Sequence, residues 1–316
     1  MNKVLITGIT GFAGSHLADY LLSLGNYDIS GTYLDDANLV NLEQKDKVRL
    51  HKLNLLDALA IEEMIAEEKP DLLFHLAALT STRNSFDNPA KTFTNNVTSQ
   101  INILEGVKKH SLDTKILVIS SAEVYGLVSP EDLPIDENTP FNPTNPYAVS
   151  KLAQDFLGLQ YNLAHKLKIV RVRPFNHVGV RQAPIFVISA FAKRIAEIEK
   201  GKEKVMKVGN LTSKRDFTDV RDMVKAYVLA LEKGKLGDVY NLGSGKSYEI
   251  SKILEMMVGM STVPIETQQD PSLLMQSDNP DLVCDPSKFE ALTGWKSEIP
   301  IEKTLEETLE YWRKAI

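Results

Sequence analysis

The sequence predicts an α/β protein with a doubly wound, parallel, Rossmann-type sheet and a smaller α/β lobe in its C-terminal part. In the first half, short apolar segments typical of buried strands alternate with segments of helical apolar spacing. This alternation is the pattern of a parallel sheet covered on both faces. The first apolar segment is followed by three evenly spaced glycines and a helix-like segment, the order found where such a sheet binds a dinucleotide.

Each element of the first half is predicted from an apolar run or from apolar residues at helical spacing. Strands are expected at residues 3–6, 28–34, 48–53, 72–76, 115–119 and 168–173. Helices are expected after Ser15 and at residues 57–68, 89–109 and 147–165. Residues 1–173 are therefore expected to form a dinucleotide-binding domain, with its ligands beyond the carboxyl ends of the strands.

From Pro174 onward the alternation is less regular. Helices are expected at residues 185–200, 220–232, 248–259, 289–294 and 304–314, short strands at 204–208 and 239–241, and irregular structure at 272–286. Residues 174–316 are expected to form mainly a smaller lobe that closes over the cofactor and binds the other substrate. Because no Gly/Ser-rich or Pro-rich linker separates the halves, some segments are expected to return to the first domain.

Composition narrows the function classes. The chain has 316 residues, of which 25% are charged and 43% hydrophobic, as in ordinary globular proteins. Its formal net charge of −6 argues against broad binding to nucleic acid or to anionic membranes. The single cysteine, Cys284, suits a reducing cytoplasm. We expect neither a signal peptide nor a membrane span, and the scattered histidines give no metal site.

The glycine turn is the first candidate binding site. Gly8, Gly11 and Gly14 are spaced G-x-x-G-x-x-G, and Phe12 and Ala13 lie between the last two. Glycines let the backbone approach a pyrophosphate closely, and its charge is then held by the free N–H groups of the helix that follows. The alternative is a tight strand–helix turn with no ligand.

A tyrosine and a lysine form the second candidate. Tyr147 and Lys151 lie one turn apart on the same face of the expected helix. An ammonium there lowers the pKa of the tyrosine, which then exchanges a proton with a carbonyl or hydroxyl group. The alternative is an exposed lysine beside a half-buried tyrosine.

Two strand ends supply further candidates. Ser121 and Glu123 follow the expected strand 115–119, so a hydroxyl and a carboxylate lie where the ligand should be. Ser121 could hydrogen-bond a reacting oxygen, and Glu123 could act as a base or orient a sugar hydroxyl; the alternative is a helix cap beside a solvated carboxylate. The segment Phe74-His-Leu-Ala-Ala78 ends strand 72–76 with small residues, which leave room for a flat ring or ribose, whereas His75 is expected to be a packed core residue.

Together these pieces resemble the extended short-chain dehydrogenase/reductase family, whose members are NAD(P)-dependent epimerases, dehydratases and reductases of sugar nucleotides. The resemblance spans nearly the whole chain. It rests on motifs in the family's order, namely the glycine turn, His75-Leu-Ala-Ala78, Asn96-Val97, Ser120-Ser121, Tyr147-x-x-x-Lys151 and Arg173-Pro-Phe-Asn176. It implies that Tyr147 is the acid/base, that Lys151 is its partner and binds the nicotinamide ribose, and that Ser121 is the companion hydroxyl.

The resemblance also implies binding residues. For the cofactor these are Asn54, Leu55, Leu76, Ala77, Ala78 and Asn96, in addition to the glycine turn, Tyr147 and Lys151. For the sugar nucleotide, bound mainly by the lobe of residues 174–316, they are Asn176, Arg181, Lys193, Val208 and Arg215. Arg215 could meet the diphosphate as a forked donor; the alternative is a structural Arg–Asp pair.

Within the family, residues 173–179, 186–193, 208–211 and 215–222 are most similar to the branch that reduces GDP-4-keto-6-deoxy-D-mannose. The implied reaction is NAD(P)H-dependent reduction of the C4 keto group to give GDP-D-rhamnose. A GDP-mannose 4,6-dehydratase or another sugar-nucleotide epimerase or dehydratase remains an alternative, because Glu123 suits C5 deprotonation. A non-catalytic NAD-binding regulator is a more remote one.

Some positions depart from the family's pattern. Met275 stands near the place of a diphosphate-binding arginine, and Val180 follows Gly179 where a proline is usual, with Arg181 next. These changes leave the nucleotide base open.

Cofactor choice leans weakly to NAD(H), because Asp35 and Asp36 would repel a 2′-phosphate. The family also implies a homodimer through helices 89–109 and 147–165, for which Leu152, Phe156, Leu157 and Tyr161 offer apolar side chains.

Overall fold

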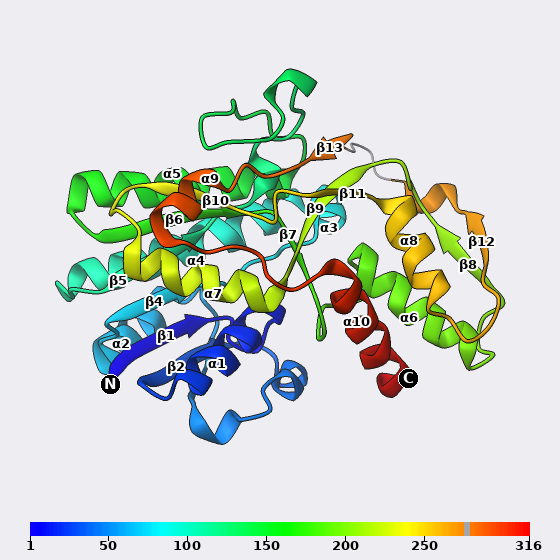
Figure 1. Cartoon of the computed structure of the whole chain (residues 1–316). Helices are drawn as coiled ribbons and strands as arrows, with labels where there is room; N and C mark the ends of the chain where they lie inside the picture. Colours follow the sequence, from blue (N-terminus) through cyan, green and yellow to red (C-terminus); the bar gives the residue numbers. More distant parts are fainter. Residues whose placement is uncertain (275–278) are drawn as a thin grey trace.

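The computed structural model describes residues 1–274 and 279–316. Its centre is a seven-stranded sheet in the order β10-β6-β5-β4-β1-β2-β3 (Figure 1), and every strand pair in it is parallel. The strands are β1 (Asn2–Thr7), β2 (Tyr27–Tyr33), β3 (Arg49–Lys52), β4 (Leu72–His75), β5 (Lys115–Ile119), β6 (Lys168–Pro174) and β10 (Val239–Leu242). The predicted doubly wound parallel sheet is confirmed.

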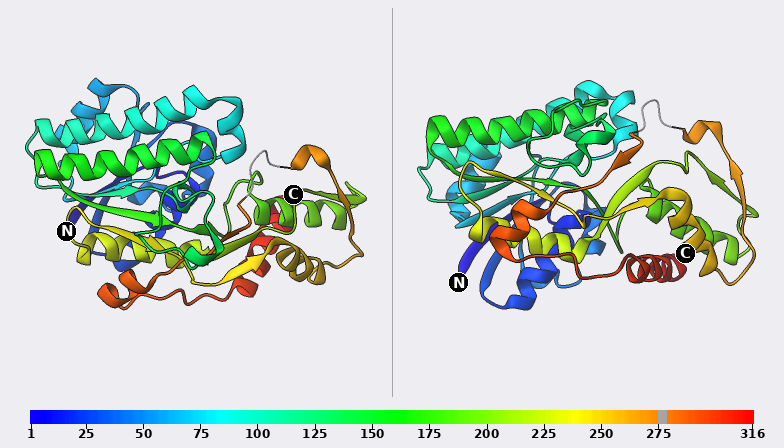
Figure 2. Two further views of the ribbon diagram at one scale, coloured as in Figure 1. Left: turned by 90° about the horizontal axis from the view of Figure 1, so that it is seen from above. Right: turned by 45° about the horizontal axis from the view of Figure 1, so that its top comes forward.

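Helices cover both faces of this sheet. One face carries α1 (Phe12–Leu24), α7 (Val220–Lys233) and α9 (Ser287–Thr293). The other carries α2 (Ala58–Glu68), α4 (Pro89–Lys109) and α5 (Pro146–His165), with α4 and α5 side by side (Figure 2). The short helix α3 (Thr82–Asp87) packs beside α4 and α5. An apolar core fills the space between the sheet and the helices on each face. A ligand is therefore expected at the carboxyl ends of the strands, which these helices leave open.

The second lobe has two small sheets and its own core. One sheet joins β7 (Asn176–Val178), β9 (Lys214–Asp219), β11 (Ser247–Glu249) and β13 (Asp281–Leu282), and the other joins β8 (Val205–Val208) to β12 (Glu266–Gln269). Three helices pack together around the core, namely α6 (Val187–Glu199), α8 (Ile250–Gly259) and α10 (Ile301–Ala315).

The C-terminal half returns to the first domain in three places. Strand β10 pairs with β6, while α7 packs against α1 and α9 against β10. The halves are therefore interwoven. No helix in the described ranges combines the length and the apolar character needed to cross a membrane.

Most predicted elements agree with the structure to within a few residues, but several short ones were not predicted. These are α3, β7, β9, β11, β12 and β13. Strand β9 has the sequence Lys-Arg-Asp-Phe-Thr-Asp, which carries no apolar alternation. The prediction of irregular structure for residues 272–286 was wrong at Asp281–Leu282, where β13 pairs with β9.

Candidate active site

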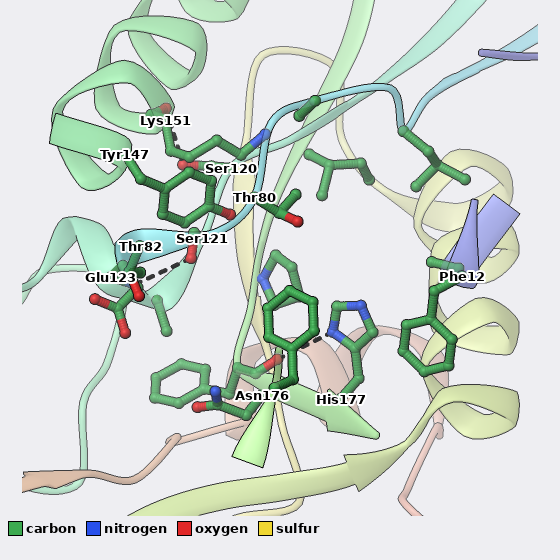
Figure 3. A pocket seen from close by; sticks show the side chains of 18 of the residues that line it. Phe12, Thr80, Thr82, Ser120, Ser121, Glu123, Tyr147, Lys151, Asn176 and His177 are labelled. Atoms are coloured by element: carbon green, nitrogen blue, oxygen red, sulfur yellow. Dashed lines mark hydrogen bonds between the residues drawn. The ribbon is translucent and has the colours of Figure 1, made fainter. Parts of the chain in front are cut away.

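A pocket of about 440 Å³ opens at the carboxyl ends of the central strands and is closed on its other side by the second lobe. Its lining comes from the glycine turn, from the ends of β4, β5 and β6, from α5 and α7, and from β7 and β9. Figure 3 shows Tyr147, Ser121 and Glu123 on one side of this pocket and Phe12 on the far side. The pocket thus joins residues that are more than 200 positions apart in the chain.

The glycine turn has the shape that a pyrophosphate needs. Gly8 has φ +70°, and a Cβ there would lie 3.0 Å from the Ala77 backbone. A Cβ on Gly14 would lie 2.2 Å from the carbonyl oxygen of Gly8, so α1 can start this close to β1 only with glycine. Gly11 is the N-cap of α1 and offers no side-chain cap to its first N–H groups. The turn therefore fits the dinucleotide that the fold implies, with its phosphates at these N–H groups.

The end of β4 is held against this turn. Thr7 and His75 lie level in the sheet, and the Thr7 Oγ1 lies 2.8 Å from His75 Nδ1 and accepts a bond from the Ala77 N–H at 3.2 Å. Leu76 and Ala78 line the pocket.

Asn96 lies behind the same segment. The Asn96 side chain is fully buried and makes two hydrogen bonds to the backbone of Leu79. Its Oδ1 accepts from the Leu79 N–H at 2.8 Å, and its Nδ2 donates to the Leu79 carbonyl at 3.1 Å. Asn96 also donates to Ser150 Oγ on α5 at 2.9 Å. It therefore fixes the wall of the pocket from behind.

Tyr147 and Ser121 face each other in the pocket. Both are buried, and the Ser121 side chain lies close enough to Tyr147 to affect its pKa. Burial raises the pKa of Tyr147 above its ordinary value, and the nearby Glu123 carboxylate acts in the same direction, whereas the Ser121 side chain lowers it. Tyr147 is therefore a protonated phenol at neutral pH.

Lys151 is not where the sequence argument expected its charge to act. Its Nζ donates to Gln154 Oε1 at 2.8 Å, and burial lowers its pKa to about 7, with Asp155 opposing that change. The expectation that an ammonium lowers the pKa of Tyr147 was wrong for the protein alone, because burial dominates both groups. Lys151 still lines the pocket.

Glu123 lies beside the N-terminus of helix α5. Its Oε2 accepts from Asn145 Nδ2 at 3.1 Å, and Asn145 caps the helix through a 2.8 Å bond from the Ala148 N–H. The Glu123 backbone N–H donates to Ser121 Oγ at 3.2 Å. These bonds connect the carboxylate, the serine and the first turn of α5.

The second lobe contributes two of the five predicted substrate residues to the pocket. Asn176 on β7 and Arg215 on β9 line it, and Arg215 donates to the Asn279 carbonyl at 2.7 Å. Asn279 is a lining residue as well.

The other three predicted substrate residues lie outside the pocket lining. Arg181 is ion-paired with Asp19 at 2.6 Å and Glu43 at 2.9 Å. Lys193 lies over the ring of Trp312, and Val208 is buried in the core of the second lobe. Met275 lies outside the described residues.

The predicted adenosine-binding residues sit beyond the pocket as well. Asp35 caps the 3-10 helix η1 (Asp36–Asn41) by accepting from the Ala37 N–H at 3.0 Å, and Asp36 is ion-paired with Lys52. Asn54 Oδ1 accepts from the Leu56 N–H at 3.0 Å, and the carbonyl of Leu55 accepts from Asn102 Nδ2 at 3.0 Å. These contacts shape the loops after β2 and β3.

Several lining residues escaped the sequence analysis. Thr80 and Thr82 line the pocket with residues that follow β4. Because they lie close to the carboxyl end of this strand in the sequence, they could have been predicted as site residues. Gln182 and Phe186 follow the Asn176 motif. Tyr227 lies within an apolar helix and gives no sequence signal, because it has the spacing of a core residue.

Comparisons with known proteins agree with this geometry. The family model described as GDP-mannose 4,6 dehydratase matches residues 5–308. The chain is 32% identical to the GDP-6-deoxy-D-mannose reductase of Pseudomonas aeruginosa, covering 99% of this chain and 98% of that protein. It is 27% identical to the GDP-mannose 4,6-dehydratase of Vibrio cholerae serotype O1, covering 97% of this chain and 93% of that one.

The chain is also similar to solved structures over its whole length. The structure of RMD from Pseudomonas aeruginosa complexed with NADPH matches at 31% identity with a TM-score of 0.87, covering 100% of both chains. The Thermus thermophilus UDP-glucose 4-epimerase complex with NAD matches at 27% identity with a TM-score of 0.87, covering 99% of this chain and 100% of that one. The chain therefore belongs to the GDP-mannose 4,6 dehydratase family of the extended short-chain dehydrogenases/reductases.

Proposed function

We propose that this protein is an NAD(P)H-dependent reductase that converts the C4 keto group of GDP-4-keto-6-deoxy-D-mannose to a hydroxyl, giving GDP-D-rhamnose. The observation that carries the proposal is the single pocket in which the glycine turn, the Tyr147–Ser121 pair and Arg215 of the second lobe meet. The similarity to a GDP-6-deoxy-D-mannose reductase over nearly the whole length supports it.

The phenol of Tyr147 suits carbonyl reduction. When bound, the reduced nicotinamide supplies a hydride to the carbonyl carbon. Tyr147 then gives its proton to the carbonyl oxygen, so that C=O becomes CH–OH and the cofactor is left oxidised. Ser121, which lines the pocket on the same side as Tyr147, is placed to hydrogen-bond the same oxygen as negative charge forms on it.

Lys151 and Arg215 would hold the two ligands. Lys151 lines the pocket one turn after Tyr147, where an ammonium would bind the nicotinamide ribose and stabilise the tyrosinate left after proton transfer. Arg215 enters from β9 on the opposite side, where a guanidinium can bind the two oxygens of a diphosphate.

Product analysis tests this proposal directly. The purified protein is incubated with GDP-4-keto-6-deoxy-D-mannose and either NADH or NADPH. We expect the reduced-nicotinamide absorbance to fall by one equivalent per sugar nucleotide reduced, with a C4 hydroxyl product seen by NMR. Substrate conversion without net consumption of reduced cofactor would contradict the reductase assignment.

A 4,6-dehydratase is the second candidate, and Glu123 is the observation that favours it. Its carboxylate lines the pocket beside Tyr147 and Ser121, where a base could remove a proton from C5. A dehydratase would convert GDP-mannose to the 4-keto-6-deoxy product with no net change in the cofactor. Incubation with GDP-mannose therefore separates the two functions.

We further propose that the enzyme is a cytoplasmic homodimer that pairs through α4 and α5. Val149, Phe156 and Leu163 repeat every seven residues along α5 and are all exposed, and Phe93 is exposed on α4. An apolar stripe of this spacing is typical of helices that pack against a partner helix.

The dimer surface differs from the one expected from the sequence. Of the four apolar residues named there, Phe156 is exposed, but Tyr161 is buried in a core cluster and Leu152 and Leu157 pack against such clusters. These three therefore face the protein itself.

A further inference from the structure

Lys151 is held by a chain of buried amides. Its Nζ donates to Gln154 Oε1 at 2.8 Å, and Gln154 Nε2 donates to the backbone carbonyl of Asn96 on α4 at 2.8 Å. Gln100, also on α4, donates from Nε2 to the backbone carbonyl of Gln154 at 2.7 Å. All four side chains are buried, so α4 fixes Gln154 both at its backbone and at its carboxamide.

The orientation of the Gln154 carboxamide is set from both of its ends. The Asn96 carbonyl accepts only from a donor, so Nε2 faces α4 and Oε1 is left to face Lys151. The reverse orientation would place Nε2 against the donors of Lys151 and Oε1 against a carbonyl oxygen. A lysine ammonium has three donors and no acceptor, so Gln154 presents the matching group in the ligand-free protein.

The other charged and titratable groups around Lys151 give it little support. They are Asp155 and Tyr147 on α5, His75 on β4, Arg171 and Arg173 on β6, Glu123 after β5, and Arg83 and Asp87 on α3. Asp155 favours the charged form of Lys151, but its two oxygens are bonded to Arg171 and Arg173. His75 and Tyr147 are neutral at pH 7, Glu123 accepts from Asn145, and the two α3 side chains are exposed. Among the described residues, Gln154 Oε1 is the hydrogen-bond acceptor of Lys151 Nζ.

Burial opposes the ammonium, and the bond to Gln154 favours it. Removal from water lowers the pKa of Lys151 to about 7, where small changes in its surroundings decide its charge. A hydrogen bond is stronger from an ammonium than from a neutral amine, so Gln154 stabilises the charged form. A neutral amide does this without a second charge, and a ligand oxygen can replace it, whereas a carboxylate would hold the ammonium as an ion pair.

We propose that Gln154 is a positioning residue, which in the ligand-free protein holds Lys151 as an ammonium against the pocket wall, ready for the cofactor ribose and the tyrosinate. What the ammonium is held for rests on the proposed function. The role of Gln154 does not follow from the Tyr147-x-x-x-Lys151 motif, since it depends on the Asn96 carbonyl and on the packing of α4 against α5.

The test follows the titration of Lys151 in the ligand-free protein by NMR, with isotope-labelled lysine and the Lys151 signal assigned from Lys151→Arg. Gln154→Leu removes the acceptor and should lower the midpoint pH of Lys151 by about one pH unit, the effect of one hydrogen bond to a charged group. Gln154→Glu replaces the amide by a carboxylate of the same size and should raise the midpoint.

The opposite shifts separate this role from simple packing. Both substitutions remove the Nε2 donor to the Asn96 carbonyl, so a shared loss of local structure would move the midpoint in the same direction in both. Gln100→Leu is the matched control, because it removes a buried amide that is bonded to the Gln154 backbone and not to Lys151. Its midpoint should stay at the wild-type pH.

A second readout connects this bond to catalysis. The pH above which kcat/KM for NADH or NADPH falls reports an essential group of the free enzyme. That pH should be lower than in the wild type for Gln154→Leu and higher for Gln154→Glu, in step with the NMR midpoints.

An unchanged Lys151 midpoint in Gln154→Leu, or a shift in the same direction in both Gln154 variants, would overturn the inference while the proposed function stands. So would kcat/KM profiles that do not follow the NMR midpoints. If the wild type fails to reduce GDP-4-keto-6-deoxy-D-mannose, the proposed function is overturned, and the NMR titration alone still decides whether Gln154 holds the ammonium.

Discussion

His75 should make the folded protein sensitive to mild acid. Its ring is buried at the end of β4, where Nδ1 lies 2.8 Å from Thr7 Oγ1 and Nε2 has no partner among the described residues. Burial lowers the pKa of His75 from 6.5 to about 3, and the charge of Lys151 acts in the same direction. The ring is therefore neutral in the folded protein down to strongly acid pH.

The sign and size of the effect follow from proton linkage. Between pH 6.5 and about 3, the unfolded chain holds one more proton on this residue than the folded protein, so the free energy of unfolding falls as the pH falls. Each pH unit below 6.5 costs about 1.4 kcal/mol. By about pH 5 the loss is roughly 2 kcal/mol. The size of this loss is set by the unfolded pKa of 6.5, because the folded pKa lies well below 5.

Urea unfolding of the wild type and His75→Asn, at about pH 7.5 and about pH 5, measures this contribution. Asparagine keeps a polar group near the position of Nδ1 for Thr7 but cannot titrate. We expect the variant to lose about 2 kcal/mol less than the wild type between the two pH values, because other groups titrate in both proteins. An equal loss in both would refute a neutral, buried His75.

Three further predictions address the site and the assembly. Tyr147→Phe should lower turnover by about two orders of magnitude or more with little change in the Kd for NAD(P)H, and near wild-type turnover would remove Tyr147 from the mechanism. If Asp35 repels a 2′-phosphate, the wild type should bind NADH more tightly than NADPH. Asp35→Asn, which keeps the cap on η1, should reduce this difference in affinity mainly by tightening NADPH binding, whereas Asp46→Asn, at an exposed position, is the control. A wild type that binds NADPH more tightly would contradict the reasoning. Phe156→Glu should yield a monomer by sedimentation, whereas Leu59→Glu, at an exposed position of α2, should leave the dimer intact, and a wild-type monomer would reject the interface.

The middle of the central sheet could be predicted because strands such as β4 and β5 are almost fully buried and almost entirely apolar. Strand β5, Lys115–Ile119, and helix α4, Pro89–Lys109, were predicted with the bounds that the structure has. Strand β9 could not be found in this way, because its buried residues include Asp216. That carboxylate accepts from the backbone N–H groups of Ser244, Gly245 and Cys284 at 2.9–3.2 Å. A strand buried through such bonds has no hydropathy signal.

Helix α5 shows a second limit of sequence patterns. It has apolar residues on more than one side, and spacing alone does not tell which side meets the protein. Tyr161 donates to Glu105 on α4 and is buried, whereas Phe156 and Leu163 are exposed. Only the positions of the sheet and of α4 distinguish the two sides.

The pair of Tyr147 and Lys151 shows why a motif does not fix the chemistry of its residues. A tyrosine with a raised pKa keeps its proton until negative charge forms on the substrate oxygen, which is the behaviour that a reductase needs. Once the proton is given, a buried tyrosinate remains, and it favours the charged form of a lysine whose pKa is otherwise about 7. In the proposed reaction, the Lys151 ammonium would then exchange the oxygen of Gln154, 2.8 Å away, for the ligand and the tyrosinate. The spacing of these two residues on one helix places them together, but burial sets the protonation states from which the reaction starts.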